Sequence, residues 1–180
     1  KWNILIRGLS GNMNLNLFFK SCCVKYKDKT ALQIKKGFRR FKVTYRELYE
    51  KSLILASILE NAGIIKGDRI LICSPNQPEY VLSFFACSIL GAVIVPIDVK
   101  TSQEIIEKYI VQTKPKLCLK SKLVKQAINI PTIYLEDYDT LIDTGKPIKK
   151  RADVKYDDLF EIIYTSGTTG EPKGVMITHG

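Results

Sequence analysis

The amino-acid sequence predicts an α/β fold with partly parallel sheets and flanking helices. Short apolar segments of strand length alternate with longer segments of helical period, which is the pattern of parallel βαβ units with helices on both faces of a sheet. Hydrophobic residues make up 46% and charged residues 26% of the chain, so the composition is globular and excludes collagen and long disorder. A chain of 180 residues is also long enough to bury a core of its own.

The first predicted elements are a helix and a hairpin. Apolar side chains recur over residues 15–26 at the spacing of one helical face. This face includes Cys22 and Cys23, which we expect to pack in the core rather than to react. Two short runs, residues 31–34 and 39–45, flank a Lys-Lys-Gly turn and predict a β-hairpin.

Alternating helices and strands follow. Thr44 and Glu47 form a capping box that predicts a helix from Tyr45, and Gly63 is suited to end it. Residues 81–97 carry no charge, but they are too few for a membrane span and predict a buried helix and a buried strand. The further expected elements are strands at 69–73, 92–97, 116–119 and 132–135, and helices at 79–90, from a second capping box at Thr101 and Glu104, and near 122–128.

Charge and cysteine content narrow the class of protein. The net charge of +10 favours anionic ligands, yet the basic clusters lack interleaved aromatic residues and no RNP, KH or zinc-finger pattern occurs. We therefore expect solvated basic faces and no nucleic-acid partner. Five cysteines without a C-x-x-C pair indicate a reducing compartment, so the expected location is cytoplasmic. Residues 143–155 are polar and basic, and they are predicted to be linker-like.

The strongest chemical signal lies in residues 164–174, with the sequence Tyr-Thr-Ser-Gly-Thr-Thr-Gly-Glu-Pro-Lys-Gly. Its glycines let backbone N–H groups turn toward one point, and its hydroxyl side chains can hydrogen-bond phosphate oxygens. One lysine adds a positive charge. The segment therefore predicts a cradle for a polyphosphate, formed by Thr165, Ser166, Gly167, Thr168, Thr169, Gly170 and Lys173.

This cradle is not a Walker A loop, because the spacing G-x-x-x-x-G-K-[ST] is missing and no helix is predicted after it. Residues 161–164 and 175–178 predict strands, so the loop is expected to join two strands. No G-x-G-x-x-G dinucleotide fingerprint occurs. A glycine-rich hairpin turn without a ligand is the alternative interpretation.

Residues 158–179 resemble the phosphate-loop signature of the adenylate-forming, or AMP-binding, superfamily. The resemblance extends over about residues 14–179. The amino-acid sequence of the loop is most similar to that of fatty acyl-CoA synthetases, whereas peptide-synthetase domains more often carry serine at the position of Thr168. The upstream motifs that stand in the family's order are at residues 44–48, 67–69, 75–76 and 91–96.

This resemblance implies a fold and a reaction. The fold would be the first part of the large N-terminal domain of an adenylate-forming enzyme, with residues 1–180 an incomplete AMP-binding domain and the C-terminal domain absent. The reaction would be ATP-dependent activation of a carboxylic acid, expected to be a medium- or long-chain fatty acid, followed by thioester formation with coenzyme A. The loop residues named above would hold the ATP phosphates, and Thr165 would help to place Mg²⁺.

The resemblance also places the family's catalytic lysine downstream, so no catalytic residue is expected in this chain and the chain alone is expected to be inactive. His179, the only histidine, is expected to have a positional role. Two alternatives stay open: an amino-acid or aryl-acid adenylation domain that loads a carrier protein, and a non-catalytic remnant. Peripheral association with the inner face of the membrane is also open, without a transmembrane segment.

Overall fold

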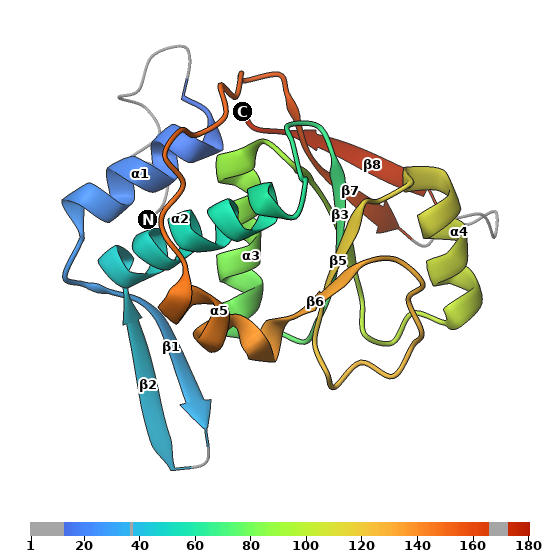
Figure 1. Ribbon diagram of the computed structural model, residues 1–180, viewed down its shortest axis with the longest axis horizontal. Coiled ribbons are helices and arrows are strands. Elements are labelled where there is room, and N and C mark those ends of the chain that lie inside the picture. Colours follow the sequence, from blue (N-terminus) through green and yellow to red (C-terminus); the bar gives the residue numbers. More distant parts are fainter. Residues whose placement is uncertain (1–12, 37, 166–172) are drawn as a thin grey trace.

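The computed structural model describes residues 13–36, 38–165 and 173–180 (Figure 1). They form a six-stranded sheet with helices on both faces and a separate two-stranded hairpin. The elements in chain order are α1 (Leu15–Lys25), β1 (Thr30–Lys36), β2 (Arg39–Thr44), α2 (Tyr45–Asn61), β3 (Arg69–Cys73), α3 (Pro78–Leu90), β4 (Val93–Ile97), α4 (Gln103–Thr113), β5 (Leu117–Lys120), β6 (Thr132–Tyr134), a 3-10 turn at Leu135–Asp137, α5 (Tyr138–Thr144), β7 (Leu159–Thr165) and β8 (Lys173–Thr178).

The large sheet is mostly parallel. Its strand order is β6-β5-β3-β4-β7-β8, and only the last pair, β7 with β8, is antiparallel. Parallel strands joined by helices are covered on both faces, which explains why β3 after Arg69 and the whole of β4 are apolar. The predicted α/β fold with a partly parallel sheet and flanking helices is confirmed.

The two faces of the sheet bury two separate apolar clusters. In β3, Ile70 and Ile72 face the cluster formed with α1, α2, α3 and α5, whereas Leu71 and Cys73 face the cluster formed with α4. The uncharged run at residues 81–97 forms α3 from residue 81 to its end and all of β4, so the predicted buried helix and buried strand are both present. No helix among the described residues is long and apolar enough to cross a bilayer.

Capping chemistry sets where the helices begin. The Thr44 hydroxyl accepts the Glu47 N–H at 3.2 Å, and the Thr44 N–H donates to the Glu47 carboxylate at 2.7 Å, which confirms the first capping box. The second prediction is wrong by one residue, because α4 is capped by Ser102 and not by Thr101. The Ser102 hydroxyl accepts the Ile105 N–H at 3.4 Å. Adjacent threonine and serine are both good caps, and sequence alone does not choose between them.

Two further local predictions fail. The helix predicted near residues 122–128 is absent; the chain turns there instead, and the Ser121 hydroxyl donates to the Glu136 carboxylate at 2.5 Å. Conversely, α5 was not predicted. It is one short helix with only Tyr138 and Ile142 buried, which is too little to establish a helical period.

The stretch at residues 143–155, predicted to be linker-like, begins in the last residues of α5 and then has no regular structure. It nevertheless packs onto the domain. Ile148 and Val154 are buried, and the Ile148 N–H donates to the Leu53 carbonyl of α2 at 3.0 Å. Its lysines face solvent, whereas Arg151 donates to the Tyr49 hydroxyl of α2 at 2.9 Å, so this stretch covers the helical layer in the described structure.

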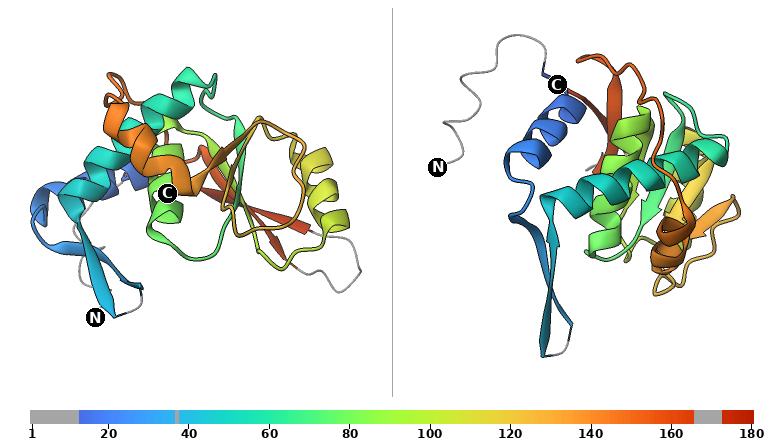
Figure 2. Two further views of the ribbon diagram at one scale, coloured as in Figure 1. Left: turned by 60° about the horizontal axis from the view of Figure 1, so that its bottom comes forward. Right: turned by 60° about the vertical axis from the view of Figure 1, so that its left-hand side comes forward.

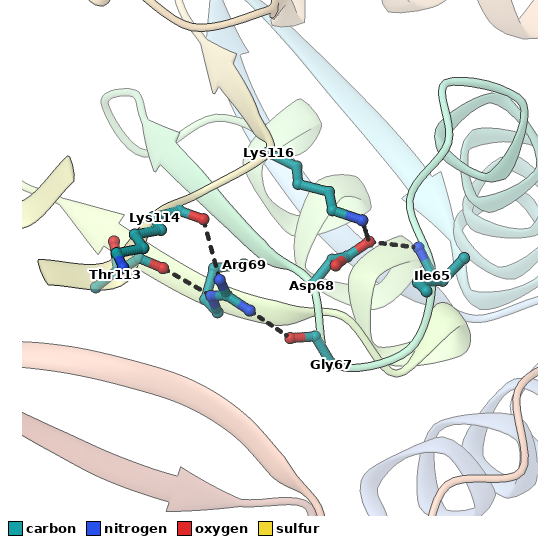
Figure 3. A network of polar contacts seen from close by, with 7 residues as sticks. All are labelled: Ile65, Gly67, Asp68, Arg69, Thr113, Lys114 and Lys116. Atoms are coloured by element: carbon teal, nitrogen blue, oxygen red, sulfur yellow. Dashed lines mark hydrogen bonds and ion pairs between the residues drawn. The ribbon is translucent and has the colours of Figure 1, made fainter. Parts of the chain in front are cut away.

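A buried carboxylate fixes the turn before β3 (Figure 3). Asp68 is 7% exposed and accepts the Ile65 N–H at 2.9 Å. The same oxygen pairs with the Lys116 ammonium at 2.8 Å. Gly67, just before it, has a φ of +83°, which favours glycine. The carboxylate thus joins the turn to the start of β5.

The next residue, Arg69, joins β3 to the end of α4 (Figure 3). Its guanidinium donates to the Thr113 carbonyl at 2.6 Å and to the Lys114 carbonyl at 3.1 Å. These carbonyls have no partner within the helix, so the cation satisfies acceptors that the helix end leaves free. The backbone of Lys114 itself has the left-handed helical conformation, with a φ of +46°.

We predict that Asp68→Ala lowers the free energy of unfolding by about 1–3 kcal/mol, because the Ile65 N–H and the Lys116 ammonium lose their acceptor at a buried site. Urea unfolding measures the change. Asp139→Ala is the matched control: its side chain is 87% exposed and lies 3.8 Å from Lys51, so the expected change is within about 0.5 kcal/mol. Equal effects of the two substitutions would contradict a structural role for Asp68.

Candidate active site

The predicted phosphate-binding loop joins β7 to β8, as the sequence indicated. The antiparallel register places Thr165 opposite Lys173 and Tyr164 opposite Gly174. Thr165 and Lys173 are both exposed, so a hydroxyl and an ammonium group lie on adjacent strands at the mouth of the loop. The other predicted phosphate ligands lie outside the described residues; they are Ser166, Gly167, Thr168, Thr169 and Gly170.

The mouth of this loop lies at the carboxyl end of the parallel strands. Ile94 of β4 pairs with Glu161 of β7, and both strands continue from there toward Ile97 and Thr165. Ligands of open α/β sheets bind outside this edge, where the loops that follow the strands meet. Thr165 and Lys173 therefore lie at the edge of the sheet where such ligands bind, and their binding role stays a prediction.

A pair of stacked tyrosines supports the base of the loop from the α4 side. The ring of Tyr164 stacks on Tyr109 with centroids 3.8 Å apart and an interplanar angle of 13°. The Tyr164 hydroxyl donates to the Gln112 side chain at 2.8 Å. Burial raises the pKa of both phenols, so they stay neutral. Sequence reasoning missed this support, since no periodicity pairs a residue of α4 with one of β7.

Gly174 keeps this region free of steric conflict. A Cβ atom at this position would lie 2.9 Å from Ile162 Cγ2 and 3.5 Å from the ring of Tyr164. A larger residue would therefore displace the side chains that hold the strand before the loop. The sequence identified the glycine as a source of backbone freedom, whereas the structure gives it a packing role.

The metal prediction rests on Thr165 alone among the described residues. Its exposed hydroxyl is an oxygen donor of the type that Mg²⁺ accepts. No group of three His, Cys, Asp or Glu side chains in the described ranges lies close enough to hold a metal ion. Thr165 therefore fits as one ligand beside substrate oxygens and water, which is how Mg²⁺ is usually bound with nucleotides.

The cysteines behave as apolar residues. All five are free. Cys23 is buried in the core and Cys22 is half-buried beside it. Burial raises the pKa of Cys23 to about 12, so its thiol stays protonated and unreactive at neutral pH.

His179 follows β8 at the end of the strand pair that is far from the loop. Its ring is 4% exposed and lies against Phe160, and neither ring nitrogen has a hydrogen-bond partner among the described residues. Its backbone N–H donates to the Asp158 carbonyl at 3.0 Å, and its carbonyl accepts the Leu15 N–H at 2.8 Å. The residue thus connects the sheet to the start of α1, which fits the positional role expected for it.

The neutral burial of His179 predicts a pH-dependent stability. Burial lowers its pKa below the ordinary value of 6.5; Asp158 opposes this shift and Lys66 adds to it. As the pH falls through 6.5, His179 becomes protonated in the unfolded chain but stays neutral in the folded chain. The free energy of unfolding therefore decreases as the pH is lowered from 6.5 to the lowered pKa of His179. The decrease is at most about 1.4 kcal/mol per pH unit.

Thermal unfolding between pH 7.5 and pH 5.5 measures this effect, and the midpoint should decrease toward the acid end. His179→Phe keeps an aromatic ring beside Phe160 and removes the titrating group. We expect a flatter pH profile for this variant. An unchanged profile would show that other groups cause the dependence.

Comparison with known proteins identifies the family. The sequence pattern of the AMP-binding enzyme family matches residues 19–180. The chain belongs to this family. It is 30% identical over 154 residues to 2-succinylbenzoate–CoA ligase of Oceanobacillus iheyensis, with 85% of this chain and 32% of that protein aligned. It is 32% identical over 191 residues to 4-hydroxybutyrate–CoA ligase 2 of Metallosphaera sedula, with 91% and 34% aligned.

The fold resembles the N-terminal subdomains of adenylate-forming enzymes. The N-terminal subdomain of Klebsiella oxytoca NpsA, in complex with 3-hydroxyanthranilyl-AMSN, superposes with a TM-score of 0.81 at 26% identity. That match covers 94% of this chain and 42% of the NpsA chain. The chain spans about a third of the length of the curated CoA ligases that it matches.

Proposed function

We propose that the protein carrying this chain activates a carboxylic acid with ATP and then transfers the acyl group to coenzyme A. A medium- or long-chain fatty acid is the substrate class that the amino-acid sequence of the loop favours. The observation that carries the proposal is the pairing of Thr165 with Lys173 at the mouth of a glycine-rich loop in an AMP-binding family fold. A cytoplasmic location and peripheral association with the inner face of the membrane belong to the same proposal.

In the first step a carboxylate oxygen attacks the α-phosphorus of ATP. The bond from this phosphorus to the bridging oxygen breaks, and negative charge builds up on the leaving pyrophosphate. The Lys173 ammonium and the Thr165 hydroxyl are suited to stabilise this charge, together with the predicted donors of residues 166–170. Mg²⁺, held in part by Thr165, supplies further positive charge to the phosphates when bound. In the second step the coenzyme A sulfur attacks the acyl carbon and AMP leaves.

A second candidate is an adenylation domain that loads an aryl acid or an amino acid onto a carrier protein. The likeness to the NpsA subdomain, solved with 3-hydroxyanthranilyl-AMSN, favours this candidate. The two functions share the first half-reaction and differ in the acid and in the acceptor thiol. A non-catalytic remnant would lack the first half-reaction altogether.

ATP–pyrophosphate exchange by the full-length protein tests all three. Fatty acids of increasing length, aryl acids and amino acids are supplied one at a time, and coenzyme A or a carrier protein is then offered as acceptor. Exchange with fatty acids and transfer to coenzyme A is the expected result. Exchange confined to aryl or amino acids would favour the second candidate, and no exchange with any acid would favour the remnant.

We predict that Lys173→Ala slows the first half-reaction about a hundredfold, or about 3 kcal/mol, because one charge-assisted contact to the leaving group is lost. Thioester formation from supplied acyl adenylate should be nearly unchanged, because pyrophosphate has already left. Single-turnover measurements of both half-reactions decide the matter. Lys149→Ala, which removes an exposed lysine from the stretch after α5, is the control and should alter neither. Equal losses in both half-reactions would make Lys173 a structural residue.

A further inference from the structure

The β1–β2 hairpin projects from the body of the protein as an arm (Figures 1 and 2). At its base, Ala31, Leu32 and Val43 pack against the main apolar cluster. Toward its tip the packing ends: Phe41 is 47% exposed, and Phe38 at the turn is fully exposed. The outer half of the arm is thus held in place by its ladder of hydrogen bonds and not by a core.

This arm is strongly cationic. Residues 30–44 include five lysines and arginines and no aspartate or glutamate. Lys35 lies opposite Arg40, and Lys42 lies two residues further along the same face. No ion pair between described residues uses Lys35, Arg39, Arg40 or Lys42. These charges are therefore available to an external anionic partner.

The opposite face of the arm is apolar except at its outer end, where Arg39 lies two residues from Phe41. Ile34 pairs with Phe41, and Leu32 pairs with Val43, so these side chains share one face. Phe38 extends this apolar character to the tip, where nothing in the described structure covers its ring. The outer half of the arm therefore combines two exposed aromatic rings, Phe38 and Phe41, with cations on both of its faces.

We propose that the β1–β2 hairpin docks the protein on an anionic lipid surface, with Phe38 entering the interface and Lys35, Arg39, Arg40 and Lys42 at the level of the headgroups. A bilayer presents a layer of negative charge directly above an apolar layer, in the order in which the arm presents its groups. A nucleic acid would account for the cations. It would not account for the exposed rings of Phe38 and Phe41, and Gln33 is the only amide side chain in the hairpin for reading bases.

The β1–β2 hairpin would be the part of the protein that makes the peripheral membrane contact of the proposed function, and in that respect the inference rests on the proposed function. The arm lies away from the end of β7 and β8 where the loop begins (Figures 1 and 2). Docking through the arm therefore leaves the mouth of the loop open to solvent.

Co-sedimentation of the full-length protein with vesicles tests the proposal. The vesicles are phosphatidylcholine alone, or phosphatidylcholine with about a third phosphatidylglycerol, at low and at physiological salt. Binding is expected only to the anionic vesicles and should weaken with salt. Each cation near such a surface contributes about fivefold, so Arg39→Gln with Arg40→Gln should weaken partition about 30-fold. Phe38→Ser should weaken it about tenfold.

Matched controls separate the arm from net charge and from general apolar exposure. Lys149→Gln with Lys150→Gln removes the same charge from the stretch after α5, and Leu123→Ser alters a side chain that is 74% exposed elsewhere. Both controls should bind like the unaltered protein. Thermal unfolding confirms that all variants fold, and their pyrophosphate exchange in solution should be unchanged, which keeps failure of docking distinct from failure of the proposed reaction.

Three results would overturn the proposal. The control pair could lose as much binding as the arm pair, which would mean that only net charge matters. Phe38→Ser could bind as tightly as the unaltered protein, which would exclude entry of the tip into the interface. A DNA duplex could bind more tightly than the anionic vesicles at the same salt concentration, which would make nucleic acid the partner.

Discussion

The burial of β3 and β4 on both faces is the constraint on which the rest of the structure depends. Ile70, Leu71, Ile72 and Cys73 are each fully buried, and they alternate between the two apolar clusters. A strand of this kind is stable only if helices cover the sheet on both faces. Two helical layers, parallel connections and polar turns at the strand ends all follow from this requirement.

Because the central strands are apolar between their ends, their position is set at their ends. Asp68 and Arg69 do this at the start of β3, through one ion pair and three side-chain bonds to backbone carbonyls. The strands then deliver their carboxyl ends to a common edge, where the β7–β8 turn begins. Tyr109 of α4 stacks on Tyr164 near the end of β7, so the geometry of the candidate site depends on packing of the same layers.

The sequence predicted most of this architecture because periodicity and capping are local signals. The alternation of apolar segments indicated the parallel sheet, and Thr44 with Glu47 marked the start of α2 correctly. The failures concern choices that depend on distant residues. The turn after β5 is set by contact with Glu136, and the support of Tyr164 by Tyr109 and Gln112 joins segments that no local pattern connects. The loop itself was recognisable because glycine, hydroxyl and lysine residues at fixed spacing are the groups that bind phosphates, and they lie close together in the sequence.

The attachment of α1 has a consequence for the order in which the chain can acquire its structure during synthesis. The Leu15 N–H is satisfied by the His179 carbonyl, and the Asn14 side chain donates to the Val154 carbonyl at 2.5 Å. These partners leave the ribosome long after α1 itself, so the start of the helix stays without them while the sheet is being made. Contacts between such distant residues are the slow ones in folding, because a long loop must close before they form. The contacts that fix the start of α1, the earliest helix of the described chain, are therefore among the last to form.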